Sequence, residues 1–105
     1  KGVIMLIELN KDNFENETST GLKLIEFYTT WCTYCRNQRI ELEDLKDSDM
    51  WIGLVDAEEC PELAMKYGIK GFPTFVLLKD GKKVAEFVGF HEKPQLLNKL
   101  MAYLK

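Results

Sequence analysis

The stretch Trp31-Cys32-Thr33-Tyr34-Cys35 is the part of this sequence that says most about its fold, because it puts two cysteines between a predicted strand and a predicted helix. The apolar residues Leu22–Tyr28 predict the strand, and the residues after Cys35 continue the helix. The two thiols then lie one helical turn apart and can close into a disulfide with little backbone movement. A helix N-terminus favours the thiolate of Cys32, the nucleophilic form. The stretch therefore predicts a candidate redox centre.

Hydrophobic periodicity and turn residues divide the rest of the chain into alternating strands and helices. Further strands are predicted at residues 3–9, 51–55, 74–78 and 83–88. Helices are predicted from a cap at Asn10 or Asp12 to Thr18, and over residues 32–45, 61–67 and 92 or 94 to 104. The order is βαβαβαββα, with parallel crossovers first and a hairpin turn at Asp80-Gly81. We expect an α/β fold with a central mixed sheet and helices on both faces.

Several side chains of the helices are predicted to face the core, because they fall on apolar stripes. They are Phe14, Cys35, Leu42, Leu45, Leu96, Leu97, Leu100 and Leu104. The cysteine pair follows the second strand, and ligands of such folds bind beyond the carboxyl ends of the parallel strands. The pair is therefore predicted to lie in the ligand crevice.

Length and composition are those of an ordinary globular protein. With 105 residues, 46% of them hydrophobic and 30% charged, residues 1–105 are expected to form a single domain. The net charge of -3 offers no basic surface for nucleic acid. The apolar run at residues 3–7 is too short to span a membrane or to form a signal-peptide core. Two alternatives stay open, namely that residues 1–4 are native and that Met5 is the native start.

The cysteine count bears on location and on metal binding. Three cysteines are too few for the disulfide framework of a small secreted domain, so we expect a cytoplasmic protein, or an exported one if a signal peptide was removed. The alternatives for the pair are a structural thiol pair and half of a zinc site, but only Cys60 and His91 remain as soft ligands, and no metal is expected. We expect Cys60 to be a structural or incidental thiol, with a regulatory or dimerising role as the alternative, and His91 to be solvated.

Five stretches give the chain a resemblance to the thioredoxin family that covers nearly its whole length. They are Ile25-Glu26-Phe27-Tyr28, Trp31-Cys32-Thr33-Tyr34-Cys35, Tyr67-Gly68-Ile69-Lys70-Gly71-Phe72-Pro73-Thr74, Lys79-Asp80-Gly81-Lys82 and Val88-Gly89. A Cys-x-x-Cys pair alone is a weak signal, but its combination with a preceding Trp and a later Gly-Phe-Pro-Thr is specific. The resemblance implies a thioredoxin fold, with a five-stranded mixed sheet flanked by four helices.

The resemblance also implies a role for each residue of the site. Cys32 would be the exposed nucleophile that forms a mixed disulfide with the substrate, and Cys35 the buried thiol that resolves it. Pro73 would be a cis-proline that leaves the backbone of Phe72 free to pair with an extended substrate segment. The substrate surface would be formed by Trp31, Thr33, Tyr34, Phe72, Pro73 and the Gly89-Phe90 loop.

Glu26 interrupts an apolar strand where family members carry a buried carboxylate beneath the two sulfurs. The resemblance makes it the third catalytic residue, because burial raises a carboxyl pKa and lets the group exchange a proton with Cys35 near neutral pH. Thioredoxins usually have Asp there, and Glu is more similar to a protein disulfide isomerase catalytic domain. The alternative is an exposed edge residue with no catalytic part.

Other positions depart from the family pattern. Thr33-Tyr34 is neither the Gly-Pro of thioredoxins nor the Gly-His of the isomerases. Ile40 replaces a proline of the active-site helix, and Ile52 replaces a strand lysine that accompanies the buried acid in many relatives. Arg36 and Arg39 are expected to be charges of the helix surface, with the alternative that Arg39, which falls near the Cys35 side, perturbs the site.

The implied activity is that of an enzyme, a thiol–disulfide oxidoreductase that reduces protein disulfides in cell redox homeostasis and electron transport. Its redox group would be the Cys32–Cys35 disulfide, with no bound cofactor. Electrons would come from a thioredoxin reductase-like partner that carries the flavin and uses NADPH, and the protein would be a monomer without nucleic-acid or membrane partners. Two alternatives stay open: a disulfide oxidase or isomerase of an oxidising compartment, and a thioredoxin-fold interaction module.

Overall fold

The computed structural model describes residues 5–45 and 51–104. Its strands are β1 (Met5–Leu9), β2 (Leu22–Tyr28), β3 (Trp51–Asp56), β4 (Thr74–Lys79) and β5 (Lys82–Val88). Its helices are α1 (Phe14–Thr18), α2 (Thr33–Glu43), α3 (Pro61–Lys66) and α4 (Lys93–Met101). This order confirms the predicted βαβαβαββα. The first two residues of the predicted strand 3–9, and the question about residues 1–4, lie outside the described residues.

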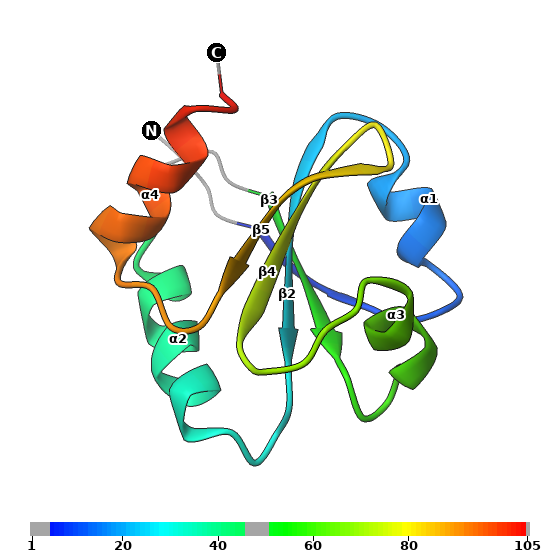
Figure 1. Ribbon diagram of the computed structural model, residues 1–105, viewed down its shortest axis with the longest axis horizontal. Coiled ribbons are helices and arrows are strands. Elements are labelled where there is room, and N and C mark those ends of the chain that lie inside the picture. Colours follow the sequence, from blue (N-terminus) through cyan, green and yellow to red (C-terminus); the bar gives the residue numbers. More distant parts are fainter. Residues whose placement is uncertain (1–4, 46–50, 105) are drawn as a thin grey trace.

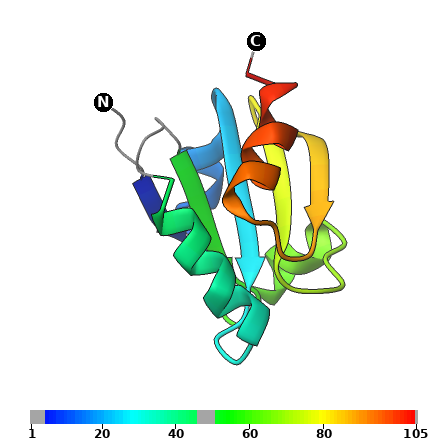
Figure 2. The same cartoon turned by 90° about the vertical axis from the view of Figure 1, so that its left-hand side faces the viewer.

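The strands form one mixed sheet, as predicted, and their order in it is β1-β3-β2-β4-β5. The central strand β2 is parallel to β3 and antiparallel to β4, and β5 is antiparallel to β4. Helices α1 and α3 cover one face of the sheet, and α2 and α4 cover the other (Figure 1). Figure 2 looks onto the face covered by α2 and α4. The observed layers are those of the thioredoxin fold.

Each face of the sheet carries its own apolar cluster, and β2 contributes to both because successive strand side chains point to opposite faces. Ile25 and Phe27 belong to the cluster under α1 and α3. Leu24 belongs to the cluster under α2 and α4, and Tyr28 packs against it. Glu26 lies between Leu24 and Tyr28 in this alternation. Its side chain therefore points to the face that α2 covers.

Three local predictions differ from the structure. The N-cap of α1 is Asn13, whereas the side chain of Asn10 accepts the backbone N–H groups of Asp12 and Asn13 in the preceding turn. Helix α2 ends at Glu43, two residues earlier than predicted. The prediction that Leu104 faces the core is wrong, because α4 ends at Met101 and Leu104 is 56% exposed beyond it.

Candidate active site

The two cysteines lie where the chain passes from β2 into α2. The end of β2 is held in place by the backbone N–H of Ala57, which donates to the carbonyl oxygen of Tyr28 at 2.8 Å. Cys32 is the N-cap of α2, and Cys32 and Cys35 form a disulfide with their Cα atoms 5.2 Å apart. The backbone N–H of Cys35 donates to the Sγ of Cys32 at 3.1 Å. The helix N-terminus thus places a hydrogen-bond donor on the sulfur that would carry negative charge after reduction.

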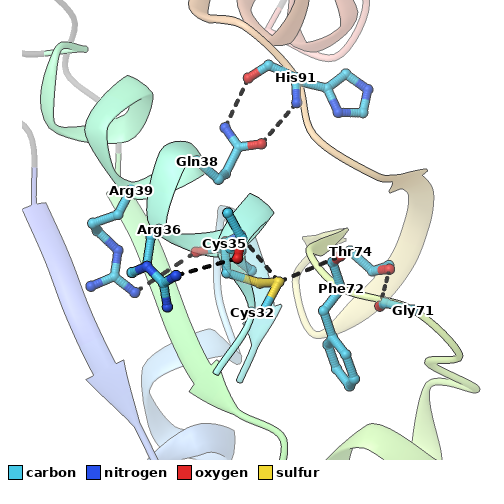
Figure 3. Close-up of a disulfide and its surroundings, with 11 residues drawn as sticks. Cys32, Cys35, Arg36, Gln38, Arg39, Gly71, Phe72, Thr74 and His91 are labelled. Atoms are coloured by element: carbon cyan, nitrogen blue, oxygen red, sulfur yellow. Dashed lines mark hydrogen bonds and ion pairs between the residues drawn. A yellow bond between two sulfur atoms is a disulfide. The ribbon is translucent and has the colours of Figure 1, made fainter. Parts of the chain in front are cut away.

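The two cysteines differ little in exposure, with Cys32 8% and Cys35 4% exposed. The expectation of an exposed Cys32 is therefore wrong for this disulfide form. The Sγ of Cys32 is folded back over the first turn of α2, and it lies 3.7 Å from the carbonyl oxygen of Phe72 (Figure 3). The helix on one side and the loop of Phe72 on the other cover the sulfur.

Two loops from distant parts of the sequence meet beside Cys32. The peptide bond between Phe72 and Pro73 is cis, as the resemblance implies. The backbone N–H of Gly89 donates to the carbonyl oxygen of Pro73 at 2.8 Å, which fixes the loop after β5 against the cis-proline. Gly89 has a φ of 94°, a value that disfavours any side chain, so this junction requires glycine.

The predicted substrate residues fall into an exposed group and a group that is at least partly buried. Trp31, Thr33 and Tyr34 are exposed around the start of α2, whereas Phe72 is partly buried against the cluster under α1 and α3. The remaining two, Pro73 and Gly89, are joined by the hydrogen bond described above. A residue that the sequence did not point to, Glu58, accepts the indole N–H of Trp31 at 2.7 Å. This bond holds the tryptophan ring at the surface.

Glu26 is fully buried, so the alternative of an exposed edge residue is wrong. Neither of its carboxylate oxygens has a hydrogen-bond partner among the described residues. A guanidinium nitrogen of Arg39 lies 4.0 Å from one of them. Burial raises the pKa of Glu26 to about 7, while the charge of Arg39 lowers it and that of Glu8 raises it. The carboxyl group is thus poised to gain or lose a proton near neutral pH.

The structure also contains a contact that the sequence did not predict, between Gln38 of α2 and the backbone of His91. The side-chain amide of Gln38 donates to the carbonyl oxygen of His91 and accepts its N–H, both at 2.8 Å (Figure 3). The ring of His91 packs edge-on against Phe75, and its Nδ1 lies 2.8 Å from the carbonyl oxygen of Gly89. The prediction of a solvated His91 is therefore wrong. Gln38 ties the loop of Gly89 to the helix that carries the cysteines.

Replacing Gln38 with alanine is expected to lower the free energy of unfolding by about 2 kcal/mol, because it leaves a buried N–H and a buried carbonyl of His91 without partners. Urea unfolding of the oxidised protein measures the loss. Asn37→Ala is the matched control, since Asn37 is an exposed neighbour on the same helix, and it should change stability by less than about 0.5 kcal/mol. Equal losses in the two variants would mean that the Gln38 contact contributes little.

The remaining predictions concern Cys60 and metal binding. Cys60 is a free, buried thiol at the N-cap of α3, in the cluster under α1 and α3. Burial, followed by the nearby charge of Glu62, raises its pKa, which favours the protonated form of the thiol. In the part of the chain that the structure describes, no three His, Cys, Asp or Glu residues gather as metal ligands. None of the helices described there is long and apolar enough to cross a membrane.

Comparisons with known proteins agree on one family. The family model for thioredoxin matches residues 5–102. The chain is 37% identical over 95 residues to a thioredoxin of Chlamydia caviae, which covers 89% of this chain and 93% of that protein. It is 32% identical over 102 residues to a thioredoxin of Staphylococcus epidermidis, with 94% and 98% covered. The solved structure of a mutant thioredoxin from Halobacterium salinarum superposes with a TM-score of 0.82 at 27% identity, covering 98% of this chain and 92% of that one.

Proposed function

The chain belongs to the thioredoxin family, and on that premise we propose that it reduces disulfide bonds of other proteins through Cys32 and Cys35. The protein is a thiol–disulfide oxidoreductase, and thioredoxins carry out this chemistry through their own disulfide without a bound cofactor. The observation that carries the proposal is the Cys32–Cys35 disulfide at the N-terminus of α2, beside the cis peptide bond of Pro73. The two alternatives, a disulfide oxidase or isomerase and an interaction module, are not favoured by the comparisons.

In the proposed reaction the Cys32 thiolate attacks one sulfur of the substrate disulfide, and the other substrate sulfur leaves as a thiolate. Cys35 then loses its proton and attacks the Sγ of Cys32, which releases the second substrate sulfur and forms the Cys32–Cys35 disulfide. Two electrons have passed from the protein to the substrate. Glu26 accepts the proton of Cys35, a role supported by its burial and by a pKa raised to about 7.

The surface around Cys32 is suited to an extended segment of a protein substrate. Exposed Trp31, Thr33 and Tyr34 offer an apolar and hydrogen-bonding contact surface on the helix side. On the other side the cis-proline loop presents the backbone of Phe72, whose carbonyl oxygen lies 3.7 Å from the Sγ of Cys32. We assign Pro73 and Gly89 to the same surface, as the elements that hold this loop in position.

We further propose that a thioredoxin reductase-like protein, with its own flavin and NADPH, returns electrons to the disulfide. The proposed setting is the cytoplasm, which is supported by the use of three cysteines as one redox pair and one buried thiol. The protein is proposed to act as a monomeric single domain over residues 1–105. The net charge of -3 supports protein partners over nucleic acid.

The reduction potential of the Cys32–Cys35 pair tests the direction of electron flow. Equilibration with glutathione is expected to give a value near that typical of thioredoxins, about −270 mV, whereas an oxidase or isomerase would lie near about −120 to −180 mV. Reduction of insulin with dithiothreitol or a thioredoxin reductase as electron donor tests the activity itself. A potential in the oxidising range, or no insulin reduction with either donor, would overturn the proposed reductase function.

A further inference from the structure

Among the described residues, the cation that lies against the buried carboxyl group of Glu26 comes from the active-site helix. A guanidinium nitrogen of Arg39 lies 4.0 Å from its Oε1. Neither carboxylate oxygen has a hydrogen-bond partner among the described residues. On the neighbouring strands, Glu26 is paired with Leu54 and Phe75, which carry no charge. The positive charge that faces this carboxyl group therefore comes from α2, whereas the charge that the sheet adds, from Glu8 of β1, is negative.

Arg39 is held in its position by a ring of β2. Its guanidinium carbon lies 5.1 Å from the centre of the Tyr28 ring, a distance at which a cation is attracted to the face of an aromatic ring. The hydroxyl of Tyr28 in turn donates to the carboxylate of Glu8 at 2.6 Å. Arg39 is 31% exposed, so one part of its side chain reaches solvent while another approaches Glu26. It spans the distance between the buried acid and the surface.

An open pocket of about 300 Å³ lies beside this arginine. It is lined by Tyr28, Thr29, Thr30, Cys35, Arg36 and Arg39. The Oγ1 of Thr29 and the Nε of Arg39 are buried and have no hydrogen-bond partner among the described residues. The pocket thus borders both Cys35 and the cation that faces Glu26.

We propose that Arg39 is a positioning residue for proton transfer, which places its positive charge against the buried Glu26 carboxylate and lies between that carboxylate and a pocket open to solvent. The inference rests on the proposed function and deepens it. In the resolving step the proton of Cys35 passes to Glu26, the Cys35 thiolate attacks the Sγ of Cys32, and the substrate sulfur leaves as a thiolate. Glu26 then releases its proton to solvent on the side where Arg39 borders the pocket, and the departing substrate thiolate takes a proton from solvent.

The charges around Glu26 predict how it responds to a change at position 39. Arg39 of α2 favours the ionised carboxylate, and Glu8 of β1 disfavours it. In the oxidised protein neither Cys32 nor Cys35 titrates, so Glu26 can be followed without their interference. Removing the arginine charge leaves the burial and Glu8 in place. The pKa of Glu26 must then rise above about 7.

The experiment compares Arg39→Met with Arg36→Met, because both variants remove one positive charge from α2 beside the same pocket. Carbon-13 NMR of the Glu26 carboxyl group in the oxidised protein is expected to show a pKa higher by about 1 in Arg39→Met, and a clearly smaller change in Arg36→Met. Arg39→Lys, which keeps the charge but not the planar group, should lie between wild type and Arg39→Met. In single-turnover oxidation of the reduced protein by insulin, Arg39→Met should resolve the mixed disulfide about fivefold more slowly at pH 7.

An unchanged Glu26 titration in Arg39→Met, or an equal change in Arg36→Met, would overturn the inference. The two measurements also separate it from the proposed function. If wild-type protein reduced no insulin at any pH, the reductase function would fail, while the NMR titration would still report whether Arg39 governs Glu26. If insulin reduction were normal and the Glu26 titration did not change in the Arg39 variants, only the proposed role of Arg39 would be overturned.

Discussion

The Cys32→Ser variant is expected to lose insulin reduction by at least about 10³-fold, measured above the background of dithiothreitol alone. A serine hydroxyl is not ionised near neutral pH, and it cannot form a disulfide with either Cys35 or a substrate sulfur. The variant therefore cannot transfer two electrons to a substrate disulfide. The turbidity of precipitating insulin chains provides the measurement.

Two other cysteine variants act as controls for this result. Cys35→Ser keeps the nucleophile, so it is expected to stop after the first step and to accumulate a covalent adduct with an insulin chain, visible by mass spectrometry without reductant. Cys60→Ser should reduce insulin at the wild-type rate, since Cys60 is buried among the apolar residues under α1 and α3. Insulin reduction that survives in Cys32→Ser would show that another group is the nucleophile.

The strands and the order of the elements along the chain could be predicted because they depend on local signals. The bounds of β2 match the prediction, since a strand buried on both faces is a continuous apolar run. Asp80 and Gly81 have positive φ values of 50° and 84°, which the Asp-Gly pair predicts for a tight hairpin turn. The end of α4 had no such signal. Leu104 continues the apolar spacing of Leu100, but the chain leaves the core after Met101, and spacing alone does not report where a core ends.

Some features of the candidate site follow from local sequence motifs, whereas others depend on contacts between distant parts of the chain. The cysteine pair, the cis-proline and the position of Glu26 follow from motifs that the resemblance identifies. The contact of Gln38 with the backbone of His91 joins residues 53 positions apart, so it depends on how two elements pack. One signal was present in the sequence: Gln38 falls on the buried stripe between Cys35 and Leu42, where a polar side chain needs a partner. The sequence does not say which partner it finds.

Glu26 is expected to make the stability of the protein depend strongly on pH. Its pKa is raised by burial from an ordinary value of 4.5 to about 7 in the folded protein, so the folded state holds the proton more tightly than the unfolded state. The resulting stabilisation is fully present below pH 4.5 and is lost as the pH rises through about 7. This shift corresponds to about 3 kcal/mol, a large part of the typical stability of a domain. Glu26→Gln carries no ionisable group at this position, so its free energy of unfolding should not fall in this way as the pH rises.

Urea unfolding of the oxidised wild type and Glu26→Gln from pH 4 to pH 8 measures this effect. The two proteins are expected to have similar free energies of unfolding at pH 4, and the variant should be more stable by about 3 kcal/mol at pH 8. Glu43→Gln, which removes an exposed carboxylate from α2, should show no such pH-dependent gap. A gap of the same size at every pH would mean that hydrogen bonding or packing, and not a buried charge, separates Glu26 from glutamine.

The same variant links stability to activity. If Glu26 is the proton acceptor of Cys35, Glu26→Gln should resolve the mixed disulfide more slowly at the very pH values where it is the more stable protein. A variant that is more stable above pH 7 and resolves at the wild-type rate would show that the buried acid destabilises the fold without serving the reaction. Greater stability together with slower resolution is the outcome expected for a carboxyl group that remains in the core because the redox chemistry uses it.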